Sequence, residues 1–305
     1  MSHLADKFML FIYHPKINFL LRSILKPFAK IIPKKFLFPV NGTFQIKLEE
    51  GKSFKLICNP TSFLGRLLYW GGEKGFEYES IRIFKKLVLN AEVFFDIGAN
   101  IGYYSLVASA LNPKIKIVGF EPMPAAIKFF KKNIAINNFK NIQIEEIALS
   151  DKPGSITFYA VKSRKFLDIP DHLNGDGTIN LNNINSSLNE QINVQTDTLD
   201  AFVERNKISR IDMMKMDTEA SEHLILSESK NVLATIRPII MIEVISNKIE
   251  SDLIQIFEKN NYTFYLAEKR GLRKVVNLNS QTQNSKDDYF MVPSEKEYIV
   301  KEFVI

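Results

Sequence analysis

The strongest constraint on the fold is an alternation of short apolar runs with helical patterns, which begins at Val93 and continues almost to the end of the chain. Such alternation predicts a parallel sheet with helices on both faces, because parallel strands are joined by crossover helices. Ligands of these sheets bind beyond the carboxyl ends of the strands. The predicted strands lie at 93–97, 116–122, 141–149, 211–217 and 238–244, with a late pair at 262–267 and 289–293.

The first of these strands ends in an acidic residue, Asp96, which precedes two glycines in "DIGANIGYYS". Gly98 and Gly102 allow the backbone to approach a ligand closely. The dinucleotide fingerprint G-x-G-x-x-G is broken, because Asn100 stands at its second glycine position. A carboxylate directed at the ligand would also repel a pyrophosphate. The pattern favours a ligand that carries a cationic amino group and no phosphate.

The second strand ends in Glu121-Pro122, where a carboxylate can accept hydrogen bonds from ribose hydroxyls. A ribose and an ammonium group without phosphates are both found in S-adenosylmethionine, which we therefore predict as the cofactor. Asp96 then holds the amino-acid end of this cofactor or shapes the loop around it. The alternative is a purely structural acid that caps the following helix.

Six segments, in order and over Phe76 to Val292, resemble the FkbM family of S-adenosylmethionine-dependent methyltransferases. The resemblance implies the α/β fold of class I methyltransferases, with a Rossmann-like, mostly parallel sheet of seven strands. It also implies methyl transfer to hydroxyl oxygens of sugars, polyketides or other small metabolites. The segments are "DIGANIGYYS" (96–105), "FEPMP" (120–124), "EEIALSD" (145–151), "VQTDTLDAF" (194–202), "MKMDTEASE" (214–222) and "RPIIMIEV" (237–244).

The cofactor-binding residues predicted from these motifs lie at four strand ends. They are Asp96, Gly98, Ala99, Asn100, Gly102, Glu121, Pro122, Ala148 and Asp217. The chain departs from the family pattern at Ala220, where a glycine is usual. Alanine would be strained there at positive φ but harmless in the first turn of a helix. We expect the helical case, because "EASEHLILSES" has a helical pattern.

Transfer to a hydroxyl requires alignment and removal of a proton, for which a carboxylate or histidine is suited. We predict Asp217 or Glu219 as the base, although strand-end acids often only bind. Lys215 alternates with Asp217 and therefore lies on the same side of its strand. Glu243 and His172 are further candidates, whereas His223 is expected to be a packed or surface residue.

Two segments are candidates for contact with the acceptor. Residues 160–193 are rich in Asn and Ser and predict a long loop, which either covers the acceptor site or is simply solvated. Four aromatic residues before the core either stack on a sugar or pack within the fold, and packing is slightly favoured. They are Tyr69, Trp70, Phe76 and Tyr78.

The basic excess of the chain belongs to its N-terminal segment. Residues 1–35 hold seven basic residues and one acid, Asp6, so their net charge is +6. This value equals the net charge of the whole chain. The remainder is neutral, so a nucleic-acid groove across the main domain is poorly supported. From 17 to 32 the segment predicts a basic amphipathic helix. Peripheral membrane contact is one interpretation, but a helix docked on the domain with its lysines in water is favoured.

We divide the chain into an N-terminal segment with a predicted hairpin at 43–58 (1–75) and a methyltransferase domain (76–305). The single cysteine, Cys58, and the absence of Cys/His metal spacings favour a reducing, cytoplasmic compartment and no metal. The sequence contains no run of about 18 uncharged apolar residues, which argues against a membrane-spanning helix. An NAD(P)-dependent oxidoreductase and a non-catalytic methyltransferase-like binding protein remain the alternative functions.

Overall fold

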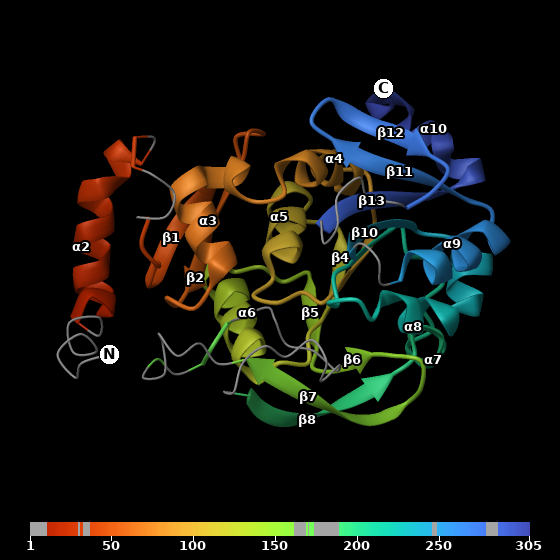
Figure 1. Cartoon of the computed structure of the whole chain (residues 1–305), viewed down its shortest axis with the longest axis horizontal. Coiled ribbons are helices and arrows are strands. Elements are labelled where there is room, and N and C mark those ends of the chain that lie inside the picture. Colours follow the sequence, from red (N-terminus) through yellow and green to blue (C-terminus); the bar gives the residue numbers. More distant parts are fainter. Residues whose placement is uncertain are drawn as a thin grey trace.

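The computed structural model describes residues 11–29, 31–32, 37–161, 169, 171–173, 189–245, 249–278 and 286–305. Its centre is one eight-stranded sheet in the order β12-β11-β13-β10-β9-β3-β4-β5 (Figure 1). These strands are β3 (Val93–Ile97), β4 (Lys116–Phe120), β5 (Ile142–Glu145), β9 (Met213–Met216), β10 (Ile239–Ile245), β11 (Tyr262–Glu268), β12 (Gly271–Val275) and β13 (Lys286–Pro293).

The predicted sheet, mostly parallel with a late antiparallel element, is confirmed. β3, β4, β5, β9 and β10 pair in parallel, whereas β13 runs antiparallel to β10 and β11. The sheet has one strand more than expected, because β12 pairs with the edge strand β11. Gly271 and Leu272 of β12 are buried, but Arg273 and Lys274 are exposed. Charged residues are common on edge strands and hide the apolar pattern of this one.

Helices cover both faces of the sheet, as the alternation predicts (Figure 1). α4 (Tyr78–Val88) and α5 (Tyr103–Leu111) pack with Phe94 in one apolar cluster. On the other face, Phe95 and Ile97 pack with α7 (Leu199–Arg205), α8 (Glu222–Ser227) and α9 (Glu250–Lys259). Successive side chains of a strand point to opposite faces. Asp96 therefore points to the same face as Phe94, toward α5.

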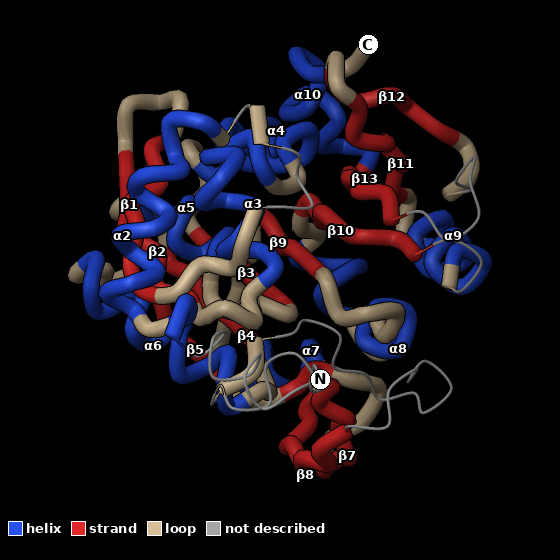
Figure 2. The backbone as a smooth tube through the Cα atoms, turned by 60° about the vertical axis from the view of Figure 1, so that its left-hand side comes forward, coloured by secondary structure: helices blue, strands red, loops and turns tan. Residues whose placement is uncertain are grey.

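A smaller sheet of three strands, in the order β6-β8-β7, lies beside the central one. Its members are β6 (Ala148–Leu149), β7 (Gly154–Val161) and β8 (Asn189–Asp197), and Figure 2 shows β7 and β8 projecting as a hairpin. The prediction of one strand over 141–149 is wrong in part, because β5 ends at Glu145 and β6 pairs with β8 instead. Most of the predicted loop at 160–193 lies outside the described residues, and its last part belongs to β8.

The predicted hairpin is confirmed as β1 (Gly42–Lys47) and β2 (Ser53–Cys58). Ile46 and Leu56 of this hairpin belong to the same apolar cluster as Phe94, so the hairpin shares the core of the central sheet. α3 (Phe63–Gly71) packs on the hairpin, and α2 (Pro15–Leu25) lies outermost (Figures 1 and 2). α6 (Pro124–Asn137) follows β4. Within the described residues, no helix is long and apolar enough to cross a bilayer.

Candidate active site

The carboxyl ends of β4, β3 and β9 meet at one edge of the sheet, because these strands are adjacent and parallel. Backbone hydrogen bonds continue past the strand ends. The N–H groups of Gly98 and Ala99 both donate to the carbonyl of Phe120 at 3.0 Å, and Asp217 N donates to the carbonyl of Ile97 at 3.1 Å. The predicted motifs at 96–105, 120–124 and 214–222 therefore form one continuous surface.

The loop after β3 needs both of its glycines. Gly98 has a φ of +76°, and a Cβ there would overlap the backbone carbonyl oxygen of Asp217. Gly102 has a φ of +88°, and a Cβ there would overlap the ring of Phe130. Asn100 also lies in the left-handed region, with a φ of +51°, which asparagine tolerates better than most residues. The motif thus encodes a close contact between the loop and the end of β9.

Asp96 serves the connection between strand and helix. Its carboxylate Oδ2 accepts hydrogen bonds from the backbone N–H of Ser105 at 3.0 Å and from its hydroxyl at 2.6 Å. The side chain is fully buried against α5. Burial raises the pKa of Asp96, although Lys215 and the bonds from Ser105 oppose the rise. This geometry favours the loop-shaping role of Asp96 over a direct role at the amino-acid end of a ligand.

Glu121 ties the second strand end to the loop after β3. Its Oε2 accepts from the backbone N–H of Asn100 and its Oε1 from that of Met123, both at 2.8 Å. Burial raises the pKa of Glu121 to about 7, against the opposing effect of these two bonds. Each carboxylate oxygen can accept a second hydrogen bond. The residue can therefore hold the loop and still receive a ribose hydroxyl.

Lys215 and Asp217 form an ion pair at the end of β9, with Nζ 3.0 Å from Oδ2, in which Lys215 is buried and Asp217 is half-buried. The lysine nitrogen also lies 5.1 Å from the centre of the Tyr104 ring. Burial alone would raise the pKa of Asp217, but the charge and hydrogen bond of Lys215, together with the charge of Lys286, outweigh burial and lower the pKa. Asp217 is therefore ionised at neutral pH and is a weak proton acceptor.

Glu219 has the opposite character. Burial raises its pKa to about 7, with Lys286 opposing the rise and Asp217 and Glu243 adding to it. Lys286 Nζ lies 3.4 Å from both carboxylate oxygens of Glu219 and 2.9 Å from Oε2 of Glu243. A carboxylate with a pKa near neutrality, held in place by an ammonium group, is well matched to accept a proton.

The expectation that Ala220 lies in the first turn of a helix is wrong. α8 begins at Glu222, and Ala220 has a φ of +70°. The carboxylate of Glu222 causes this turn, because its Oε1 accepts from the N–H of Thr218 at 2.6 Å and from its hydroxyl at 3.0 Å. The hydroxyl of Ser221 donates to the carbonyl of Thr218 at 2.6 Å. The alanine therefore occupies a position that favours glycine.

Sequence reasoning missed four residues that surround this strand end, which are Glu77, Tyr104, Lys286 and Asp288. The hydroxyl of Tyr104 donates to Glu77 Oε2 at 2.5 Å. Asp288 stands directly opposite Glu243 in the β10–β13 ladder and accepts from the hydroxyl of Ser80. Burial raises the pKa of both Glu77 and Asp288. The charges of Asp288 and Asp217 raise the pKa of Glu77 further, against the charge of Lys215. The available signal was the pair of acids at the start of the otherwise apolar "DDYFMVP".

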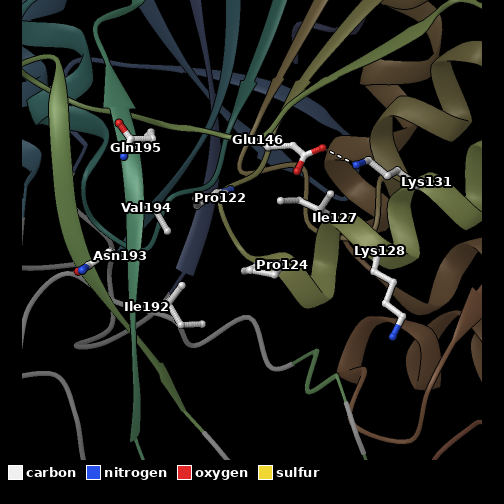
Figure 3. A pocket seen from close by; sticks show the side chains of 10 residues that line it. All are labelled: Pro122, Pro124, Ile127, Lys128, Lys131, Glu146, Ile192, Asn193, Val194 and Gln195. Atoms are coloured by element: carbon white, nitrogen blue, oxygen red, sulfur yellow. Dashed lines mark hydrogen bonds and ion pairs between the residues drawn. The ribbon is translucent and has the colours of Figure 1, made fainter.

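A cavity of about 590 Å³ opens beside the end of β4. Figure 3 shows Pro124 and Ile127 of α6 facing Ile192 and Val194 of β8 across it. Pro122, a predicted cofactor contact, lines the same cavity, whose volume is within the range of about 300–1,000 Å³ that is usual for small-molecule sites. The other lining residues are Lys128, Lys131, Glu146, Asn193 and Gln195.

The structure also places the other predicted cofactor residues and the two histidines. Ala148 is buried in β6, and Ala99 is buried in the loop after β3. His172 lies in a short described stretch that is tied to the residues after β2, where Asn59 donates to the carbonyl of Asp171 at 2.6 Å. His223 is half-buried in the first turn of α8.

The aromatic residues before the core pack within the fold. Tyr69 and Trp70 make an edge contact with 4.9 Å between ring centres. Phe76 lies against Tyr103, with 6.1 Å between ring centres, and the hydroxyl of Tyr78 donates to Glu49.

The residues at this edge fit S-adenosylmethionine. The backbone at Gly98 leaves no room for a side chain, and Glu121 retains acceptor capacity for a ribose. The excess of carboxylates around Asp217 suits a positively charged sulfur and an ammonium group. Among the described residues, no group of three or more His, Cys, Asp or Glu side chains is placed to hold a metal ion.

Comparisons with known proteins point to one family. The family profile of the methyltransferase FkbM domain matches residues 96–264, which is more than half of the chain. The chain is similar to 31-O-demethyl-FK506 methyltransferase FkbM of Streptomyces tacrolimicus, with 28% identity over 153 residues that cover 45% of this chain and 58% of that protein. Methyltransferase 1 of Beauveria bassiana is 28% identical over 134 residues, which cover 42% and 54%. The chain thus spans somewhat more than half the length of these two relatives.

Among solved structures, the methyltransferase FkbM of Methylobacillus flagellatus KT aligns with 74% of this chain and 54% of its own, at 14% identity and a TM-score of 0.41.

Proposed function

The chain belongs to the FkbM methyltransferase family, and we propose that it transfers a methyl group to a hydroxyl oxygen of a sugar, a glycan or a related small metabolite. S-adenosylmethionine is the cofactor and supplies, when bound, a methyl group on a positively charged sulfur. In this proposal Glu121 holds the ribose, and the backbone of the loop from Gly98 to Gly102 lies against the ligand. The buried, free thiol of Cys58 supports a reducing, cytoplasmic compartment for the reaction.

The observation that carries transfer to oxygen is the environment of Glu219. A hydroxyl must lose its proton as it attacks, and a carboxylate with a pKa of about 7 can take that proton at neutral pH. The proton is received on a carboxylate oxygen of Glu219. Lys286 stabilises the ionised form of Glu219 before the transfer and keeps the side chain beside Glu243.

The charge of the site supports an uncharged acceptor. Carboxylates outnumber ammonium groups here, because Lys215 and Lys286 face the acids Glu77, Asp217, Glu219, Glu243 and Asp288. A phosphate group next to the transferred methyl would be repelled by this excess. Sugar hydroxyls carry no charge and can hydrogen-bond to several carboxylates at once.

Calorimetry tests the cofactor half of the proposal. S-adenosylhomocysteine should bind, and NAD should not. Glu121→Ala should lose about 1–3 kcal/mol of S-adenosylhomocysteine binding, because charge-assisted hydrogen bonds are removed. Glu92→Ala is the matched control, since this exposed side chain pairs only with Arg210 at the opposite end of β3 among the described contacts. Tight NAD binding without a response to S-adenosylhomocysteine would contradict the proposal and favour an oxidoreductase.

A screen with methyl-labelled cofactor tests the acceptor half. Sugars, sugar nucleotides, small alcohols and amines are offered to the purified protein, and the labelled atom is identified by mass spectrometry. Label on a hydroxyl oxygen supports the proposal, whereas label on nitrogen or carbon contradicts it. Cofactor binding without transfer to any of these acceptors would favour the non-catalytic binding protein, for which the strained Ala220 is the supporting observation.

A further inference from the structure

Helix α2 is docked on the protein through polar side chains. Asn18 is fully buried, donates to the carbonyl of Pro39 at 3.0 Å and accepts from the N–H of Asn41 at 2.9 Å. Arg22 is also buried, donates to the carbonyl of Thr43 at 2.8 Å and lies 4.8 Å from the centre of the Tyr69 ring. The inner face of this helix therefore carries an amide and a guanidinium group.

The outer face of α2 is apolar, although the outer face of a surface helix is usually polar. Phe19, Leu20 and Ile24 are 59%, 60% and 57% exposed. Leu20 and Ile24 are one helical turn apart, so their side chains form a stripe on one face. Phe28 extends this stripe just beyond the helix and is more than half exposed. Apolar side chains gathered on one exposed face mark an interaction site.

The charge around this stripe has one sign. Lys16 is exposed beside it, whereas Lys26 Nζ lies 4.3 Å from the centre of the Tyr69 ring, and residues 11–29 contain no acidic residue. Residues 1–35 carry the entire excess of +6, whereas the rest of the chain is neutral. Apolar side chains flanked by lysines are the pattern of helices that lie in the interface of anionic membranes.

We propose that the outer face of α2 binds the surface of an anionic lipid bilayer, with Phe19, Leu20, Ile24 and Phe28 inserted between the headgroups. Lys16 then contacts lipid phosphates. A second copy of the chain fits this face poorly, because it would bring an equal positive charge against Lys16. The sequence alone had favoured a docked helix with its lysines in water, and the exposed apolar stripe is the observation that changes this balance.

Vesicle sedimentation with the full chain tests the proposal. The wild-type protein should sediment with vesicles of equimolar phosphatidylglycerol and phosphatidylcholine, less at high ionic strength, and not with phosphatidylcholine alone. The triple variant Phe19→Ser, Leu20→Ser, Ile24→Ser should bind at least about tenfold more weakly, because its apolar contacts are lost. Val276→Ser is the control, since Val276 is 80% exposed and directly follows β12, outside the stripe.

A charge variant separates the electrostatic contribution to vesicle binding from the contribution of the apolar side chains. Lys16→Glu should weaken binding to the anionic vesicles by about tenfold and leave thermal unfolding unchanged, because the side chain is exposed. The proposal is overturned if the wild-type protein ignores anionic vesicles at low ionic strength. It is equally overturned if light scattering shows a dimer that the triple variant converts to a monomer while vesicle binding stays unaffected.

Discussion

Glu219 is the residue on which the proposed chemistry depends most, because its carboxylate accepts the proton. Because its pKa is raised to about 7, the ionised form that accepts a proton increases as the pH rises through neutrality. We expect the rate to rise with pH, with a midpoint near 7. Glu219→Gln should bind S-adenosylhomocysteine normally, lose about 10²–10⁴-fold in rate and lose this acidic limb. Steady-state rates between pH 5.5 and 8.5, a range of roughly one and a half units on each side of that midpoint, provide the measurement.

Asp217→Asn is the companion variant. The pKa of Asp217 is lowered by Lys215 after burial is taken into account, so the residue is ionised throughout this range. If Asp217 only holds the cofactor, its amide variant should weaken cofactor binding and keep an acidic limb, whose midpoint moves to lower pH because the charge of Asp217 no longer raises the pKa of Glu219. An acidic limb that persists in Glu219→Gln and vanishes in Asp217→Asn would reverse the two roles.

Ala220 is a strained residue whose replacement should stabilise the protein. Its φ of +70° costs a residue with a Cβ about 1 kcal/mol or more. Ala220→Gly should therefore raise the free energy of unfolding by about 0.5–1 kcal/mol, after the added flexibility of the unfolded chain is subtracted. Ala135→Gly is the control, because Ala135 is exposed within helix α6. This substitution should lower the free energy of unfolding by an amount similar to the gain expected for Ala220→Gly. A destabilised Ala220→Gly in urea unfolding would contradict the assignment of strain.

At the scale of single residues, sequence reasoning found the strand-end acids but not all of their roles. Asp217 and Glu219 follow an apolar strand and are visible in the motif. The burial of Asp96 against Ser105 depends on the alternation of one strand and on the helix above it. Asp288 reaches the site only through the register of β13 against β10, which no local pattern contains.

At the scale of elements, the loop after β3 and the end of β9 behave as one unit, because Gly98 packs on the backbone of Asp217. Gly98→Ala would add a Cβ at positive φ and against that carbonyl oxygen. We expect the free energy of unfolding to fall by about 2 kcal/mol or more, and S-adenosylhomocysteine binding to fall with it. Gly71→Ala is the control, because its φ is −93° and a Cβ there meets no atom within 4 Å. A Gly98→Ala variant with normal cofactor affinity would remove the loop from the binding site.

The elements themselves were largely predictable from periodicity. Strands β3, β4, β9 and β10 are short apolar runs with helices after most of them, and these patterns are strong. The break between β5 and β6 was not predictable, because "NIQIEEIAL" is continuous in β-forming residues. Only the pairing of β6 with β8, from a segment some fifty residues away, separates the two.

At the scale of the whole molecule, the chain keeps two charge systems apart. The N-terminal segment carries the basic excess and an exposed apolar stripe, whereas the strand-end site gathers carboxylates on a neutral body. The site is built from residues between Glu77 and Asp288, so it depends on the complete central sheet. The free energy of unfolding of the protein should therefore depend on the protonation of these buried acids.

The free energy of unfolding should fall as the pH rises from about 5 to 8. Burial raises the pKa of Glu121 and Glu219 from 4.5 to about 7, so between these values the folded chain binds more protons than the unfolded chain. The lowered pKa of Asp217 affects stability only below this pH range, because the stabilisation that it contributes to the folded state is lost only in acid. The raised pKa of Lys286 affects stability only above this pH range, because the stabilisation that Lys286 contributes to the folded state is lost only in strong base.

Urea unfolding at pH 5, 6, 7 and 8 measures this slope, which each of the two glutamates can change by up to about 1.4 kcal/mol per pH unit. Glu219→Gln removes one titrating group and should flatten the slope. Glu79→Gln, in the first turn of α4, is the control and should leave it unchanged. A wild-type protein that gains stability between pH 5 and 8 would contradict the burial of these carboxyls in the folded state. It would also withdraw the raised pKa that makes Glu219 the proposed proton acceptor, since both effects arise from the same low-dielectric surroundings.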